Sequence, residues 1–281
     1  MIKVFKQNIK KKRVIPGFGI SMGVTIAILS IIVLIPLASL ILYTSKIGFK
    51  EFISIVTQKD VISAYKVSFV CSFIAALINA IFGVILAWVL EKYEFKGKRF
   101  LDGLIELPFA LPTAVAGITL TYLYSDKGII GKIFSNIGVK IAYTKIGITI
   151  AMIFIGIPFV VRTIQPILNK MDKQYEEAAF TLGASKRRTF FKVILPEIFP
   201  AALTGFGLAF ARGLGEYGSV VFIAGNIPYE TQIVPLLIMN KLEQFNYSSA
   251  TALALVMLIV SFLLLFIINT IQSLIAKRTN N

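Results

Sequence analysis

Long apolar segments alternate with short charged segments along this chain. A helix needs ~20 mostly apolar residues to cross a bilayer, and six runs of about this length cover residues 20–43, 61–90, 104–124, 146–168, 199–224 and 250–275. We predict six membrane-spanning helices, the third either kinked or locally unwound between Pro108 and Pro112. These runs leave no polar face for water, which excludes a soluble helical bundle.

The composition supports this assignment. Hydrophobic residues make up 57% of the 281 residues and charged residues only 15%, against about 25% charged in a typical soluble domain. We therefore predict an all-α integral membrane protein with one transmembrane domain, 20–275, between a basic arm, 1–19, and a short tail, 276–281. The net charge of +15 is spread between the apolar runs, a distribution typical of juxtamembrane segments and not of a nucleic-acid-binding face.

The distribution of Lys and Arg predicts the orientation. If there are six spans, 18 of these residues fall on the side of the two termini and eight fall on the other side. Because cytoplasmic loops carry the excess of positive charge, we expect both termini in the cytoplasm of a multi-pass protein of the cell (inner) membrane. The long outer connection, 125–145, has room for a short helix of its own.

The polar stretch 172–196 differs from the other connections. Its apolar residues recur at i, i+3, i+4 and i+7, the spacing of one helix face, at Tyr175, Ala178, Ala179 and Leu182. Asp172 is a candidate N-cap, and Gly183 stands where a chain leaving a helix often adopts positive φ. Ser185 is placed to cap a second short, basic helix. The pattern predicts a helix–turn–helix outside the bilayer with an apolar face for a partner's groove; an ordinary amphipathic loop helix is the alternative.

The fifth apolar run contains an opposite pair of charges. Arg212 and Glu216 are spaced i, i+4 about halfway along it. Ionisable residues at such depth are costly and often functional, so the pair either lines a translocation pathway or only stabilises the bundle. Small residues recur every four positions in the same run, which predicts close packing against a neighbouring helix, at Gly207, Ala211, Gly215 and Ser219.

Several kinds of chemistry are excluded. Gly213, Gly215 and Gly218 have the spacing G-x-G-x-x-G, but they lie inside an apolar run, and Ile238 stands where a dinucleotide fold needs an acid. The chain has no phosphate-binding G-x-x-x-x-G-K-[ST] motif, no histidine, and one cysteine, Cys71. We predict no catalytic centre, no metal, no cofactor and no internal disulfide. If ATP drives this protein, another chain must bind it.

One motif in the stretch 172–196 carries a resemblance to a known family. Glu177-Ala178-Ala179, then Gly183, then Leu195-Pro196 resembles the EAA loop of ABC importer permeases, with Val193 where that family usually has Ile. The resemblance implies a type I importer fold with a cytoplasmic coupling helix. It also implies that this helix docks on an ATPase subunit through Tyr175, Glu177, Ala178, Ala179, Leu182 and Gly183.

Further segments narrow the resemblance. Residues 91–128 resemble permeases of sulfate and molybdate importers, and residues 211–238 and 241–254 resemble the T-type sulfate/thiosulfate permeases. This implies half of a pathway for sulfate or thiosulfate, or alternatively for molybdate or tungstate. The implied partners are a CysW-like second permease, two CysA-like ATP-binding subunits and an extracytoplasmic sulfate-binding protein. A secondary transporter and a polytopic membrane enzyme are the alternatives from other classes.

Overall fold

The computed structural model describes residues 18–279. Most of the predicted basic arm, residues 1–17, and the last two residues of the predicted tail lie outside this range. Within it the chain is helical, without a strand, and it divides into two units at Gly48 and Phe49. In the first unit, α1 (Phe18–Leu29), η1 (Ser30–Leu34) and α2 (Ile35–Thr44) follow one another as an apolar helical segment of 27 residues.

The second unit begins at the short helix α3 (Phe49–Val56) and contains the remaining helices. Long helices form its centre: α4 (Lys59–Lys92), α8 (Lys145–Lys170), α11 (Leu195–Leu214) and α14 (Tyr247–Thr279). The shorter ones are α5 (Lys98–Ala110), α6 (Thr113–Tyr124), α7 (Ile129–Ser135), α9 (Lys173–Thr181), α10 (Lys186–Thr189), η2 (Phe190–Ile194), α12 (Val220–Ile223) and α13 (Val234–Glu243).

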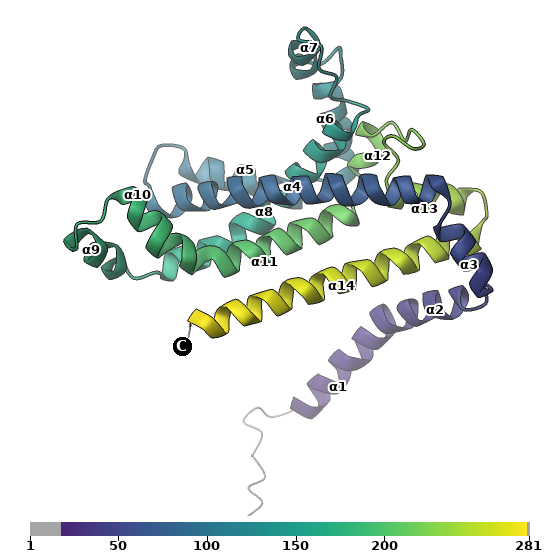
Figure 1. Cartoon of the computed structure of the whole chain (residues 1–281), viewed down its shortest axis with the longest axis horizontal. Coiled ribbons are helices and arrows are strands. Elements are labelled where there is room, and N and C mark those ends of the chain that lie inside the picture. Colours follow the sequence, from purple (N-terminus) through teal and green to yellow (C-terminus); the bar gives the residue numbers. More distant parts are fainter. Residues whose placement is uncertain (1–17, 280–281) are drawn as a thin grey trace, which may run out of the picture. The chain divides into compact units, whose positions relative to one another are not determined.

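The core of the second unit lies among α4, α8 and α11, which run side by side (Figure 1). Near the end that holds α9 and α10, Leu90, Ile164 and Ile198 pack in one buried cluster. Toward the other end, Ile148 and Ile223 belong to a second cluster. α14 packs on α11 and α13. The first cluster joins α4, α8 and α11, and the second joins α4 and α8 to α12 and α13, so apolar residues from distant parts of the sequence form the core.

Each predicted apolar run corresponds to helical structure, and two runs are interrupted. Within residues 18–279, five segments are long and apolar enough to cross a membrane, and the third run is a pair of helices, α5 and α6, bent by 114°. The bend lies at Leu111 and Pro112, whereas Pro108 remains inside α5. The residue before a proline avoids the helical region, which explains the break. The connection 125–145 contains α7, in agreement with the predicted short helix.

The fifth run differs most from its predicted bounds. α11 ends at Leu214, and the residues up to Ala224 form a turn followed by the single-turn helix α12. At its other end, α11 is continuous with α10 and η2 in a helix of 29 residues, Lys186–Leu214. The predicted second short helix begins after Ser185 as expected, but it is the first part of this longer helix. The π-helical stretch η2 lies just before Leu195-Pro196, where a wider turn accommodates a proline that lacks an N–H.

Candidate functional site

The predicted first helix of the polar stretch is α9, and its ends are held by the expected residues. The Asp172 carboxylate accepts a hydrogen bond from the Gln174 N–H (3.0 Å). Gly183, just past the helix, has φ of +81°, a conformation that glycine adopts without a steric cost. The Ser185 hydroxyl accepts from the Arg188 N–H (3.3 Å) at the start of α10. Local capping thus defines both ends of the turn between α9 and α10.

One side of α9 is open to solvent. Tyr175 and Leu182 are 64% and 88% exposed, and Ala178, between them on this side, is also exposed. Ala179 is half-buried, on the side of α9 that faces the rest of the second unit. Glu177 and Gly183 are exposed. Of the four predicted apolar face residues, the structure therefore leaves three free for a partner.

The opposite side of α9 is tied to the core. Lys92, the last residue of α4, forms an ion pair with Glu176 and lies over the ring of Trp88, 5.6 Å from its centroid. Both paired side chains are about one-fifth exposed, so water screens their attraction less than at an open surface. A displacement of α9 would therefore pull directly on the end of α4.

The predicted charge pair is formed, although not on one helix. Arg212 lies in the last turn of α11, and Glu216 follows the end of that helix. The Arg212 Nη1 is 2.5 Å from the Glu216 Oε2, and the Glu216 side chain is 1% exposed. The other carboxylate oxygen accepts from the N–H and the Oγ–H of Ser219, both at 2.9 Å. The buried carboxylate is thus paired and hydrogen-bonded, as a buried charge requires.

This pair lies well inside the membrane-spanning length. Gly213, next to Arg212, packs against Ser72 of α4. Ser72 lies roughly 20 Å from one end of α4 and roughly 30 Å from the other at about 1.5 Å per residue. Arg212 itself remains 35% exposed by its side chain. The pair therefore presents one accessible cation at depth, with its counter-charge buried behind it.

Two interrupted helices meet beside the pair. A Cβ on Gly117 of α6 would lie 2.5 Å from the carbonyl oxygen of Ser219, and one on Gly218 would lie 2.1 Å from the Thr113 Oγ1. Only glycine allows such an approach. The start of α6 thus packs directly on the turn that carries Glu216. Of the predicted small-residue stripe, Gly207 packs on Ile268 of α14, whereas Gly215 and Ser219 lie beyond α11.

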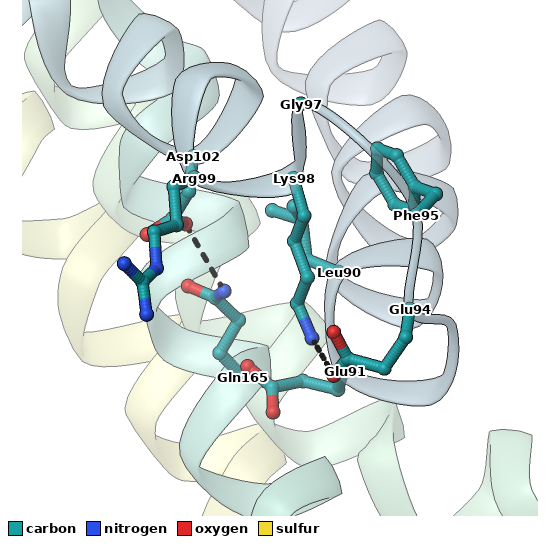
Figure 2. A pocket seen from close by; sticks show the side chains of 9 residues that line it. All are labelled: Leu90, Glu91, Glu94, Phe95, Gly97, Lys98, Arg99, Asp102 and Gln165. Carbon is teal, nitrogen blue, oxygen red and sulfur yellow. Dashed lines mark hydrogen bonds and ion pairs between the residues drawn. The ribbon is translucent and has the colours of Figure 1, made fainter.

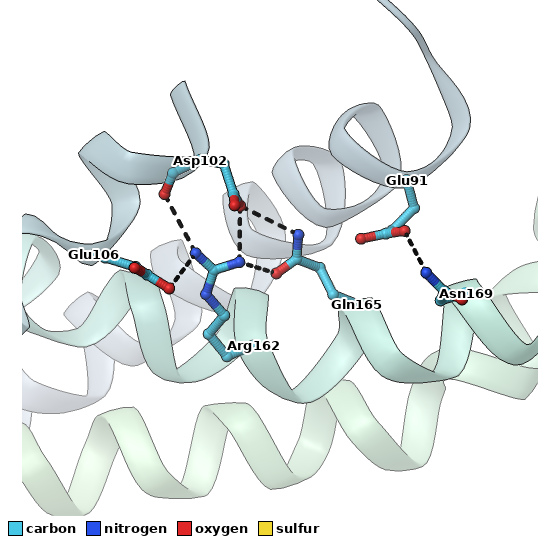
Figure 3. Close-up of polar contacts among 6 residues, drawn as sticks. All are labelled: Glu91, Asp102, Glu106, Arg162, Gln165 and Asn169. Carbon is cyan, nitrogen blue, oxygen red and sulfur yellow. Dashed lines mark hydrogen bonds and ion pairs between the residues drawn. The ribbon is translucent and has the colours of Figure 1, made fainter. Parts of the chain in front are cut away.

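A second polar network joins α5 to α8 (Figure 3). The Arg162 guanidinium forms ion pairs with Asp102 and Glu106, both at 2.7 Å. It also donates to the Gln165 Oε1 (2.5 Å), and Gln165 in turn donates to Asp102 (3.4 Å). These side chains are partly exposed. The network fastens the first half of the bent pair, α5, to a core helix.

A polar cleft of about 520 Å³ lies next to this network, around the connection between α4 and α5 (Figure 2). Lys98 and Glu94 pair across it at 2.7 Å, and Asp102 and Gln165 line its other wall. Three acidic and two basic side chains line this cleft, so neither ionic sign dominates it. Among the described residues, no group of three His, Cys, Asp or Glu side chains is arranged to hold a metal ion.

Comparison with known proteins identifies the family. Residues 79–281, more than half of the chain, match the model of the binding-protein-dependent transport system inner membrane component. The chain belongs to this family. Curated relatives align with nearly the whole length of this transport component. The sulfate transport system permease protein CysT of Salmonella typhimurium is 46% identical over 270 residues, 96% of this chain and 98% of the relative. A probable CysT of Chlorokybus atmophyticus is 50% identical over 250 residues, 89% and 87% of the two chains.

Solved structures agree on the fold of the inner membrane component. A chain of a bacterial ABC transporter involved in the import of the acidic polysaccharide alginate matches with a TM-score of 0.76, over 91% of this chain and 94% of that one, at 19% identity. A chain of the MetNI methionine ABC transporter, in an inward-facing conformation, matches with a TM-score of 0.58, over 77% and 96%, at 15% identity. The predicted type I ABC importer permease fold is confirmed.

The network around Arg162 in this transport component was not predicted from the sequence. A signal was present, because Arg162 and Gln165 are polar residues one turn apart inside an apolar run. Asp102 and Glu106 are four residues apart, again about one helical turn, around the start of the third run. Two polar stripes on separate membrane helices favour contact between them, but nothing local indicates which helices become neighbours.

Proposed function

We propose that this inner membrane component is the permease of an ATP-driven importer of sulfate or thiosulfate. The observation that carries this proposal is the 46% identity to a sulfate transport permease over almost the full length of both chains. The chain would form half of the membrane pathway, and a second permease would form the other half. Selection among oxyanions would then be shared with the binding protein that delivers them.

ATP hydrolysis would reach this pathway through α9. Its open side, with Tyr175, Ala178 and Leu182, presents apolar groups to a groove on the ATPase. Its closed side is linked to α4 by Glu176 and Lys92. When two CysA-like subunits close on ATP, each pulls on the α9 of the permease above it. The linked core helices then move as rigid bodies between two access states.

Within the pathway, Arg212 would meet the passing oxyanion. A guanidinium is permanently charged and offers five donors, which suits a tetrahedral oxyanion. Its partial exposure, beside the meeting point of the two interrupted helices, supports this role. Irregular backbone at membrane depth is tolerated where it is buried in protein or lines a polar cavity. Glu216 offsets the charge, so an ion is attracted without being trapped.

The proposed complex contains a CysW-like second permease and an extracytoplasmic sulfate-binding protein on the side opposite α9. In this arrangement α9 and both termini face the cytoplasm, in agreement with the excess of Lys and Arg on that side.

Uptake of labelled sulfate by the reconstituted complex tests the proposal. Proteoliposomes with the binding protein outside and ATP inside should accumulate sulfate, and thiosulfate should compete for uptake whereas phosphate should not. A complex without the ATPase should accumulate none, which separates this function from secondary transport. Uptake of molybdate or tungstate in place of sulfate would overturn the substrate assignment while leaving the importer assignment intact.

A further inference from the structure

A second cleft lies next to α9, between the end of α4 and the start of the long helix that contains α10 and η2. Its volume is about 490 Å³, and its walls include Trp88 and Tyr93 from α4 and the residue after it, and Lys186, Arg187 and Phe191 from the other helix. In Figure 1, α9, α10 and this end of α4 lie together at one end of the second unit. The cleft is thus placed where the apolar part of α4 gives way to charged residues.

The cleft carries uncompensated positive charge. The half-buried cation of the cleft, Lys92, is neutralised by Glu176. Lys186 and Arg187 are exposed, and within the described part of the chain neither forms an ion pair. No pathway or docking role proposed above uses these two side chains. They leave two free positive charges beside one small cleft.

Aromatic side chains form the rest of the cleft. Trp88 and Phe190 pack edge to face, with ring centroids 5.2 Å apart. Tyr93 and Phe191 remain 56% and 53% exposed. Aromatic rings with a polar edge are typical of the membrane–water boundary, at the level of lipid headgroups. Cations and aromatic rings together suit a ligand that is anionic at one end and apolar at the other.

An exposed apolar strip continues from the cleft along α4. Ile85 and Ile81 precede Trp88 by three and seven residues, so the three share one helix face. Both isoleucines remain about half exposed, 51% and 55%. A soluble anion would make no favourable contact with this apolar strip, whereas an acyl chain could pack along it.

We propose that this cleft binds an anionic phospholipid of the adjacent leaflet. The phosphodiester lies between Lys186 and Arg187, the glycerol region contacts Trp88 and Tyr93, and an acyl chain follows Ile85 and Ile81. The bound lipid contacts both the helix that leads into the membrane from α10 and the end of α4 that anchors α9. This inference goes beyond the proposed function, because it requires only that the chain lie in a bilayer.

The single tryptophan of the chain, Trp88, reports on this site directly. The full chain is reconstituted into bilayers that contain a fixed fraction of dibrominated phosphatidylglycerol or dibrominated phosphatidylcholine, and quenching of Trp88 fluorescence is measured. We expect a relative binding constant that favours phosphatidylglycerol by at least about fivefold, the usual contribution of one basic side chain near an anionic surface. Equal quenching by the two lipids would overturn the proposal.

A matched pair of variants tests the two cations. The double substitution Lys186→Gln with Arg187→Gln should bring the relative binding constant of phosphatidylglycerol over phosphatidylcholine close to one. Arg188→Gln with Lys192→Gln removes the same charge from the same segment, outside the cleft, and should leave the preference within about twofold of the unmodified chain. An equal loss in both variants would mean general attraction to the surface and no built site. Circular dichroism of each variant verifies that the helices are formed.

Inorganic phosphate distinguishes a lipid from a soluble anion as the ligand. Millimolar phosphate, compared with chloride at the same ionic strength, should leave the phosphatidylglycerol preference unchanged. If phosphate abolishes the preference and chloride does not, the cleft takes a soluble anion and the lipid proposal is wrong.

Discussion

Glu216 is the one acidic or basic side chain that is buried in the described part of the chain, and its surroundings explain how the membrane tolerates it. One carboxylate oxygen faces Arg212, and the other accepts two hydrogen bonds from Ser219. Removing one partner of a buried pair typically costs about 3–5 kcal/mol, because the remaining charge is left without compensation. Single substitutions at these positions therefore mix a structural effect with any effect on transport.

A double substitution separates the two effects. Arg212→Leu with Glu216→Gln removes both charges and keeps an amide oxygen that accepts from Ser219, so we expect normal assembly, measured by co-purification of the complex. Arg212→Leu alone should assemble poorly. If Arg212 meets the oxyanion, the assembled double variant should take up sulfate at least about tenfold more slowly while its basal ATP hydrolysis persists. Near-normal uptake would show that the pair serves only the structure.

At the scale of single helices, the sequence predicted what local chemistry determines. The caps Asp172 and Ser185 and the positive φ of Gly183 depend only on neighbouring residues, and all three follow the pattern in the sequence. The end of α11 at Leu214 does not, because residues 220–224 remain apolar and continue the run. There the close approach of Gly117 to Ser219 determines the backbone, and that contact joins residues far apart in the chain.

The open side of α9 gives a direct test of docking. Ala178→Asp places a carboxylate between Tyr175 and Leu182, and burying it unpaired in an apolar groove would cost several kcal/mol. We expect co-purification of the ATPase subunit to fall at least about tenfold while the amount of the permease in the membrane is unchanged. Ala178 is a sharper choice than the half-buried Ala179, where the same change would also disturb packing within the chain.

Ser135→Asp is the matched control for this docking test. It adds the same charge on an exposed position of α7, in the connection predicted to lie on the other side of the membrane, and should leave co-purification unaltered. If Ala178→Asp retains as much ATPase as the control does, docking does not use this side of α9.

At the scale of the whole molecule, the pattern of runs predicted the class of fold and the positions of the spans, but not how the spans meet. The network at Arg162 joins α5 to the core helix α8. The turn that carries Glu216 packs against α6, the second half of the same bent pair. Long apolar runs indicate membrane helices because the bilayer imposes their length. Which polar residues pair across them depends on tertiary packing. The sequence therefore indicated the local i, i+4 pair of Arg212 and Glu216 but not the network at Arg162, which joins two helices.

The orientation that we predict from the distribution of positive charge can be tested by labelling. Cys71 is buried, and Cys71→Ser provides a background without a thiol. In intact cells, single cysteines introduced as Lys6→Cys and Asn280→Cys should resist a membrane-impermeant thiol reagent. Lys140→Cys, at an exposed position in the connection between α7 and α8, should react. After the cells are opened, all three should be labelled, which excludes burial as the reason for protection. Labelling of both termini from outside would invert the molecule and place α9 on the side where no ATP-hydrolysing partner could reach it.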